Sequence, residues 1–246
     1  MRDSRFLCLA VSRRDGGNCI AGLDIDTGAW VRPVNLRSRG ALGDGEIVVL
    51  DNQTHQLRIM KPLDLVRLRL GDKVENPSQP ENWTLDSTSL AGSSPVLCPA
   101  CDHPTLLARI RTQAEAGNTL LDLFGTLTNS VPHSVIEQEP PARSLAVIRP
   151  RNLRWTRSTN YRGNPRMMGI FTFGVENIQY CLPLTDIDWE PKLLEATLKR
   201  PTINAAQSLG LNPTHEILLT VSLGDHFRET GNHYKLIAGV LIIPKQ

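Results

Sequence analysis

Short apolar runs separated by turn residues mark the beginning of the chain. The runs at 6–11 and 19–25 flank Asp15, Gly16 and Gly17. Glycine accepts the positive φ angles of tight hairpin turns, so this pattern predicts a β-hairpin. Further runs follow at 29–34, 46–50 and 63–70. Five short strands of this kind favour a small β-barrel over residues 1–74.

The pattern changes after residue 75 and returns to strands after residue 141. Proline and serine punctuate 76–80, and apolar residues recur at helical spacing from 106 to 114. Residues 75–141 are therefore predicted to form a partly helical insert or linker that ends at Pro140 and Pro141. Strand-like runs at 144–148, 153–156, 167–173, 178–184, 216–223 and 234–243, with a helix starting at Pro191, predict a second small barrel over 142–246.

Composition excludes several protein classes. The first apolar run is too short for a secretory core or a membrane span, because Ser12, Arg13 and Arg14 interrupt it. The five cysteines are odd in number and widely spaced, which is unlike the disulfide framework of a secreted domain. These features predict a soluble cytoplasmic protein without a membrane partner.

The net charge of +2 conceals a strong segregation of sign. Residues 142–170 contain seven arginines and no acidic residue, whereas residues 75–141 contain eight carboxylates and only two arginines. A polarised chain of this kind favours an anionic partner more than its net charge suggests.

The arginine-rich stretch also contains aromatic residues, a composition typical of surfaces that bind single-stranded nucleic acid. Cations follow the phosphates while aromatic faces stack on bases. The alternative interpretation is that Trp155 packs in the core and the arginines only face solvent. The candidate residues are Arg149, Arg151, Arg154, Trp155, Arg157, Tyr161, Arg162 and Arg166, with Arg32 and Trp30 of the first barrel as an extension. In that first barrel nearby aspartates dilute the positive charge, so solvated turns are the favoured interpretation there.

Two patterns suggest metal binding, and neither is complete. Cys98, Cys101 and the nearby His103 have the spacing of half a zinc site, but a structural site needs four ligands. The repeated Asp-Ile-Asp at 24–26 and at 186–188 places paired carboxylates at strand ends, as some nucleases do for divalent cations. Aspartate also caps ordinary turns, which is the favoured interpretation. We therefore expect no metal and no cofactor.

No common catalytic motif is present in the sequence, which favours a binding protein over an enzyme. Asp225, His226 and His233 lie close together near the C-terminus. Such a group is suited to holding a phosphate or to acid–base chemistry. An ordinary polar loop is the favoured interpretation.

Three blocks of the sequence resemble the dual OB-containing domain proteins of bacteria. They are Ser12–Gly22 together with Gly28–Val34, the proline-rich patch that ends at Trp83, and Leu219–Asp225 together with Tyr234–Gly239. The last block departs from the family pattern, with Gly-Asp-His-Phe at 224–227 in place of Gly-Glu-Pro-Phe.

The resemblance implies a mainly β protein with two OB-like small barrels in tandem and a partly helical insert. It also implies a role with nucleic acid, as an accessory component of a phage-defence or mobile-element system, and it supplies no catalytic residues. Single-stranded DNA or RNA is the leading partner. A protein-interaction scaffold that binds a partner protein and a metal-dependent nucleic-acid hydrolase remain the alternatives.

Overall fold

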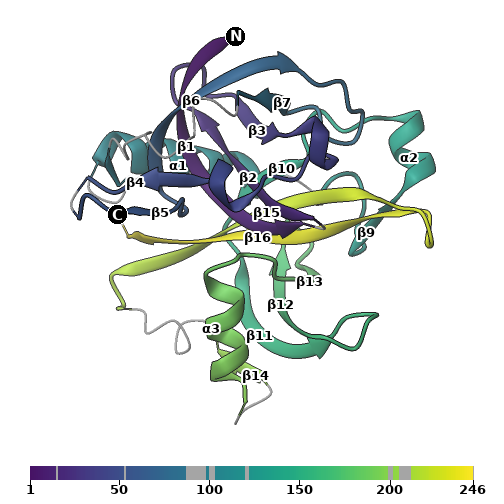
Figure 1. Cartoon of the computed structure of the whole chain (residues 1–246). Coiled ribbons are helices and arrows are strands. Elements are labelled where there is room, and N and C mark those ends of the chain that lie inside the picture. The colour runs from purple at the N-terminus through teal and green to yellow at the C-terminus, as the bar shows by residue number, and fades with distance from the viewer. Residues whose placement is uncertain are drawn as a thin grey trace. The chain divides into compact units, whose positions relative to one another are not determined.

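The computed structural model describes residues 1–14, 16–52, 54–86, 98–99, 103–119, 122–198, 202–204 and 212–245. The protein is mainly β, with 52% strand and 16% helix. It divides into two compact units, Met1–Ala108 (unit 1) and Arg109–Gln246 (unit 2), which run from purple to teal and from teal to yellow in Figure 1. None of the helices in the described ranges is long and apolar enough to cross a bilayer.

Unit 1 is a closed five-stranded barrel with a small added hairpin. Its strands are β1 (Arg2–Arg14), β2 (Gly17–Asp24), β3 (Trp30–Val34), β4 (Val48–Leu50), β5 (Leu57–Ile59), β6 (Asp64–Lys73), β7 (Asn82–Leu85) and β8 (Cys98–Pro99), with 3₁₀ helices η1 (Leu36–Ser38) and η2 (Asp44–Glu46). The barrel closes in the order β1-β2-β3-β7-β6-β1, and only β3 and β7 within it run parallel. These are the five strands of an OB barrel, and we number them first to fifth in chain order as β1, β2, β3, β6 and β7.

A bend in β1 allows this barrel to close. The first half of β1 pairs with β6 and the second half with β2, and the register shifts between Cys8 and Ala10. Gly22 lies opposite this bulge, where a Cβ atom would stand 2.0 Å from the carbonyl oxygen of Leu7. A bulge of this kind bends a strand and increases its twist, so one strand can contribute to both sides of the closure.

Unit 2 is a half-barrel made from two four-stranded sheets. Its elements are β9 (Ser130–Pro132), α2 (His133–Gln138), β10 (Leu145–Ile148), β11 (Arg151–Thr159), β12 (Pro165–Phe173), β13 (Ile178–Pro183), α3 (Trp189–Ala196), β14 (Thr202–Asn204), β15 (His215–Phe227) and β16 (Asn232–Pro244). The helix α1 (Pro104–Asn118) begins in unit 1 and ends in unit 2. The segment 75–141, predicted as an insert, thus supplies β7 to the first barrel and β9 to the second sheet system.

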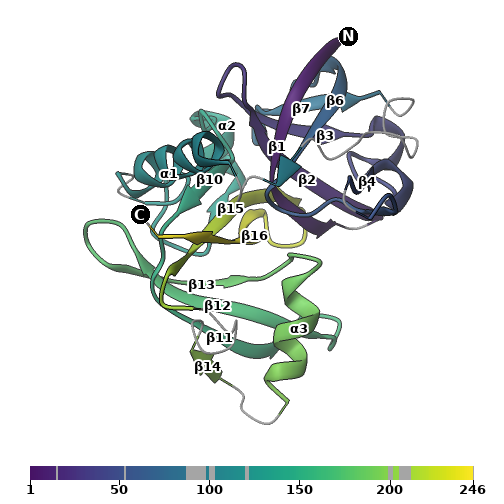
Figure 2. The same cartoon turned by 90° about the vertical axis from the view of Figure 1, so that its left-hand side faces the viewer.

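The half-barrel repeats the strand order of unit 1 with two interruptions. Its first strand is divided into β10, which pairs with β15, and β11, which pairs with β12. Arg149 and Pro150 separate the halves, and proline has no N–H to donate to a ladder. Between the third and fifth strands, β13 and β16, a parallel bridge joins Leu184 to Ile237. The helix α3 follows the third strand and lies against the β11–β13 sheet (Figure 2).

A buried lysine on the last strand of unit 2 forms hydrogen bonds with one of the unit's loops. Lys235 on β16 is fully buried, and its Nζ donates to the carbonyl oxygens of Thr126 and Thr128 at 2.6 and 2.7 Å. The same Nζ lies 5.0 Å from the ring centre of Tyr180. Burial lowers the pKa of Lys235 to about 7. Both hydrogen bonds remain available to a neutral amine, which keeps two N–H donors.

Candidate nucleic-acid interface

Strand alternation distributes the predicted arginines over different faces of the half-barrel. On β11, Arg154 is exposed, whereas Trp155 beside it is fully buried in the core. Successive side chains of a strand point to opposite faces. Arg157 has the same parity as Trp155, and its Nη1 lies 3.4 Å from the carbonyl oxygen of Leu194 on α3. The arginine run is therefore not a single continuous track, and Trp155 belongs to the core.

Two further arginines of the basic stretch, Arg149 and Arg151, have hydrogen-bond partners nearby. The Nε of Arg149 donates to Glu216 Oε2 at 2.8 Å, and the guanidinium of Arg151 donates to the carbonyl oxygen of Gly174. Arg166 is half-buried on β12. Burial raises the pKa of the Cys181 thiol, and the positive charge of Arg166 acts in the opposite direction.

Three aromatic side chains form a continuous run between two hairpin ends of unit 2. Tyr161 follows β11 and is 68% exposed. Its ring centre lies 5.8 Å from that of Phe227 at the end of β15, and Phe227 lies 6.1 Å from Tyr234 on β16. The guanidinium carbon of Arg162 lies 5.1 Å from the ring centre of Tyr161. We call Tyr161, Phe227 and Tyr234 the aromatic run.

In unit 1 the two predicted residues are less accessible. Arg32 is only 1% exposed on β3, and its backbone N–H donates to the carbonyl oxygen of Glu81 at 2.9 Å. Trp30, at the start of β3, is half-buried. Asp15, in the adjacent β1–β2 turn, lies outside the described residues.

Both Asp-Ile-Asp segments form the same type of turn. Asp24 accepts backbone N–H bonds from Asp26 and Thr27 at 3.0 and 3.1 Å, and a bond from the Ser4 hydroxyl at 2.9 Å. Its pKa is lowered because these hydrogen bonds and the charge of Arg2 outweigh its burial, although burial is the largest single effect.

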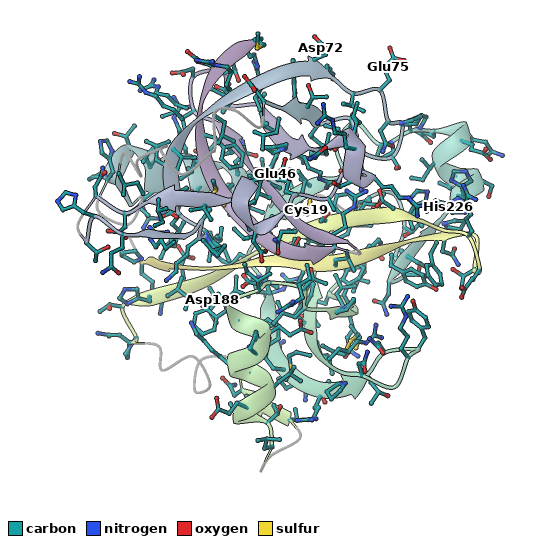
Figure 3. All side chains as sticks on the ribbon, in the orientation of Figure 1. Cys19, Glu46, Asp72, Glu75, Asp188 and His226 are labelled. Carbon is teal, nitrogen blue, oxygen red and sulfur yellow. The ribbon has the colours of Figure 1, made fainter. Side chains whose placement is uncertain are left out.

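Asp186 uses its carboxylate in the same way. It accepts N–H bonds from Asp188 and Trp189 at 2.9 and 3.0 Å, and a third from Val240 on β16 at 3.0 Å. Burial raises the pKa of Asp186 to about 6. Asp188 lies at the start of α3 (Figure 3) and forms an ion pair with Lys192 at 2.8 Å. The first carboxylate of each pair, Asp24 or Asp186, thus accepts hydrogen bonds from the backbone of its own turn.

The segment with the spacing of half a zinc site, which we did not expect to bind metal, falls partly outside the described part of the chain. Cys101 is not among the described residues, and Cys98 is described only as backbone of β8. Within the described ranges, no group of three or more histidine, cysteine or acidic side chains has a geometry able to hold a metal ion.

Half of the predicted loop at 225–232 belongs to strands. β15 continues to Phe227 and β16 starts at Asn232, so the connecting turn contains only residues 228–231. His226 and His233 face each other across the two strands. They meet His133 of α2, which is 100 positions from His233 and which the sequence pattern did not single out.

Comparison with known families identifies the family of this chain. The model of the dual OB-containing domain matches residues 4–240, nearly the whole chain. The chain belongs to the dual OB-containing domain family. Neither the curated proteins nor the solved structures contain a significant match.

Membership of the dual OB-containing domain family gives the aromatic run a structural context. OB barrels bind oligonucleotides on the face of the second and third strands and on the loops that join strands one to two and four to five. In unit 2 those loops join β11 to β12 and β15 to β16. Tyr161 lies in the first loop, and Phe227 and Tyr234 flank the second. Phe227 and Tyr234 were missed by the sequence analysis because they are distant from the arginine-rich stretch, although aromatic residues beside a predicted turn were a usable signal.

Proposed function

We propose that unit 2 binds single-stranded nucleic acid through the aromatic run and the neighbouring arginines. The observation that supports this function is the ring-to-ring contact of Tyr161 with Phe227, which links two loops that bind ligands in OB barrels. The family resemblance extends the proposal to an accessory role in a phage-defence or mobile-element system.

The chemistry of the surface suits an unpaired strand. Bases of any identity stack on aromatic faces, and base stacking is available only where bases are not enclosed in a duplex. Arg162 lies beside Tyr161, and Arg154 is exposed on β11. Arg166 is half-buried on the adjacent strand β12. In the proposed binding mode these cations neutralise phosphates, so binding is expected to weaken with salt.

A titration with a fluorescent oligothymidylate at several salt concentrations tests this proposal. Each phosphate contact contributes a log–log slope of about −0.7 for a single strand. Arg162→Ala should therefore flatten the slope by about this amount. Phe227→Ala should weaken binding at every salt concentration by about 1–3 kcal/mol and leave the slope unchanged, because stacking depends little on salt.

Arg149→Ala is the matched control, because the Arg149 guanidinium is already paired with Glu216. We expect it to retain the affinity and slope of the natural protein. Parallel titrations with RNA of the same length and with duplex DNA identify the preferred polymer. If folded Arg162→Ala and Phe227→Ala proteins bind as the natural protein does, this surface is not the site, and a protein-interaction scaffold becomes the better account.

A further inference from the structure

Three histidines from three elements meet under the β15–β16 hairpin. His133 is the first residue of α2, and Figure 3 shows His226 where the hairpin approaches that helix. The rings of His133 and His226 stack with centres 3.9 Å apart and an angle of 9° between their planes. The Nδ1 of His133 lies 3.0 Å from Nε2 of His233, which is only 2% exposed. We call these residues the histidine cluster.

The hydrogen bonds determine where the protons lie in the neutral cluster. The Nδ1 of His233 is 3.0 Å from the carbonyl oxygen of Gly224. A carbonyl oxygen only accepts, so this Nδ1 carries hydrogen, and Nε2 of neutral His233 must accept. The hydrogen between the two rings therefore belongs to Nδ1 of His133. Its other nitrogen, Nε2, lies 3.6 Å from Glu137 Oε1.

One added proton fits this arrangement. Protonation of His133 at Nε2 places the new N–H opposite the Glu137 carboxylate and leaves the bond to His233 unchanged. A single charged ring also remains compatible with the stack on neutral His226. The first proton therefore leaves all the contacts of the cluster in place.

A second proton has no comparable position. On Nε2 of His233 it would face the N–H of His133, which replaces a hydrogen bond by a donor–donor contact. On His226 it would put two cations in stacked rings 3.9 Å apart. The Nε2 of His226 is also buried without a hydrogen-bond partner in the described part of the chain.

Burial and the neighbouring charges also disfavour a second proton in the cluster. Burial lowers the pKa of His233, and repulsion from His133 and His226 lowers it further. The hydrogen bond to Gly224 and the carboxylate of Asp225 act in the opposite direction without reversing the shift. The structure places two acidic groups against the cluster, Asp225 from β15 and Glu137 from α2.

The histidine cluster is mechanically linked to the aromatic run. Phe227 follows His226 on β15, and Tyr234 follows His233 on β16. Adjacent residues of a strand point to opposite faces, so the histidines lie under the hairpin and the aromatic rings lie on its other side. The backbone N–H of His133 also donates to the carbonyl oxygen of Gly231 in the turn, at 2.9 Å.

We propose that the histidine cluster holds the β15–β16 hairpin against α2 and thereby keeps the aromatic run in its binding geometry. Entry of a second proton into the cluster separates the hairpin from α2. The binding consequence rests on the function proposed above, whereas the opening of the hairpin does not. The pKa of His233 is lowered in the folded protein. The contact between the hairpin and α2 is therefore fully stable above the ordinary histidine pKa of 6.5, and its stability is lost as the pH falls below that value.

The protein without nucleic acid provides the first test. Histidine ring signals and amide hydrogen exchange are followed by NMR between about pH 7.5 and pH 4.5, a range that brackets the ordinary histidine pKa. The amide of His133 should lose its protection at the pH where His233 gains its proton, because that amide is bonded to Gly231 across the contact. Protection of this amide that persists after all three rings are charged would overturn the proposal.

Oligothymidylate affinity at constant ionic strength provides the second test. If the hairpin stays in contact with α2 in only about a tenth of the molecules at low pH, the apparent affinity falls about tenfold. Added positive charge alone would produce the opposite trend, since protonation strengthens phosphate binding. An affinity that rises steadily as the pH falls would therefore contradict the link between the cluster and binding.

The variant His133→Asn separates the cluster from general effects of pH. The asparagine amide has both a donor and an acceptor, so it can face either the neutral or the charged form of His233. We expect this variant to bind at pH 7 and to lose the decline at low pH. His215→Gln, at the other end of β15, is the matched control and should keep the decline. If His133→Asn keeps it as well, the cluster is not responsible. If no nucleic acid binds at any pH, the proposed function is wrong. The amide exchange experiment still tests whether protonation separates the hairpin from α2.

Discussion

At the scale of single residues, the two carboxylates at 186 and 188 have different roles despite their shared motif. Asp186 is fully buried and accepts three backbone N–H bonds, whereas Asp188 pairs with Lys192 at the surface. Asp186→Ala should lower the free energy of unfolding by about 1–3 kcal/mol, because it leaves buried donors without an acceptor. Asp188→Ala should cost less than about 1 kcal/mol, as exposed ion pairs do. Urea denaturation of both variants measures the difference.

The same pair of variants distinguishes a turn from a metal site. A divalent cation held by paired carboxylates would make both substitutions equally damaging to metal-dependent cleavage. Equal stability losses in the two variants, or cleavage activity that disappears in both, would contradict the structural role assigned to Asp186.

Some residue roles were predictable from the sequence, and others depended on distant contacts. Strand-end aspartates have a local preference for turns, so the pattern around Asp24 and Asp186 correctly favoured capping. Trp155 was included among the candidate binding residues, with core packing as the alternative, because a tryptophan in a basic strand is compatible with both until its parity is known. The histidine cluster was not predictable, since His133 is separated from His233 by 100 positions.

At the scale of elements, closure of the first barrel depends on close approach between β1 and β2. A Cβ atom at Gly22 would lie 2.0 Å from the backbone oxygen of Leu7, and backbone cannot move aside as a side chain can. Gly22→Ala should therefore destabilise unit 1 by about 1–3 kcal/mol. Gly45→Ala, in η2 of the same unit, meets no atom within 4 Å and should change stability by less than about 0.5 kcal/mol. Thermal denaturation followed by circular dichroism compares them, and similar melting temperatures would refute the close-packing argument.

The strands of the barrels were predictable where local pattern and turns agreed. The run at 6–11 lies within β1, and the run at 19–25 lies within β2 except for its last residue. β7 was not predicted as a strand, because its four residues carry little periodicity and its place between β3 and β6 depends on non-local pairing. The bend in β1 depends on the bulge near Cys8, which no local motif indicates.

At the scale of the whole molecule, the mainly β fold with a closed barrel and a half-barrel agrees with the architecture that the sequence implied. The charge segregation does not follow the units, because the boundary at Ala108 and Arg109 falls inside the acidic segment 75–141. The basic stretch, in contrast, lies entirely within unit 2. The nucleic-acid interface that we propose therefore lies in one unit and not along the chain as a whole.

The last strand should be essential to unit 2 and dispensable for unit 1. β16 pairs with β15 and β9, and its residues Ile237, Leu241 and Ile243 are fully buried. A chain that ends before Tyr234 loses these contacts, so the core around Trp155 should open. The barrel of unit 1 contains no strand from this region and should keep its hydrogen bonds. Hydrogen exchange with mass spectrometry should show protection retained in β1, β2 and β6 and lost in β10, β12 and β15. Retained protection in β12 would show that the half-barrel folds without its final strand, and lost protection in β1 would show that unit 1 depends on unit 2.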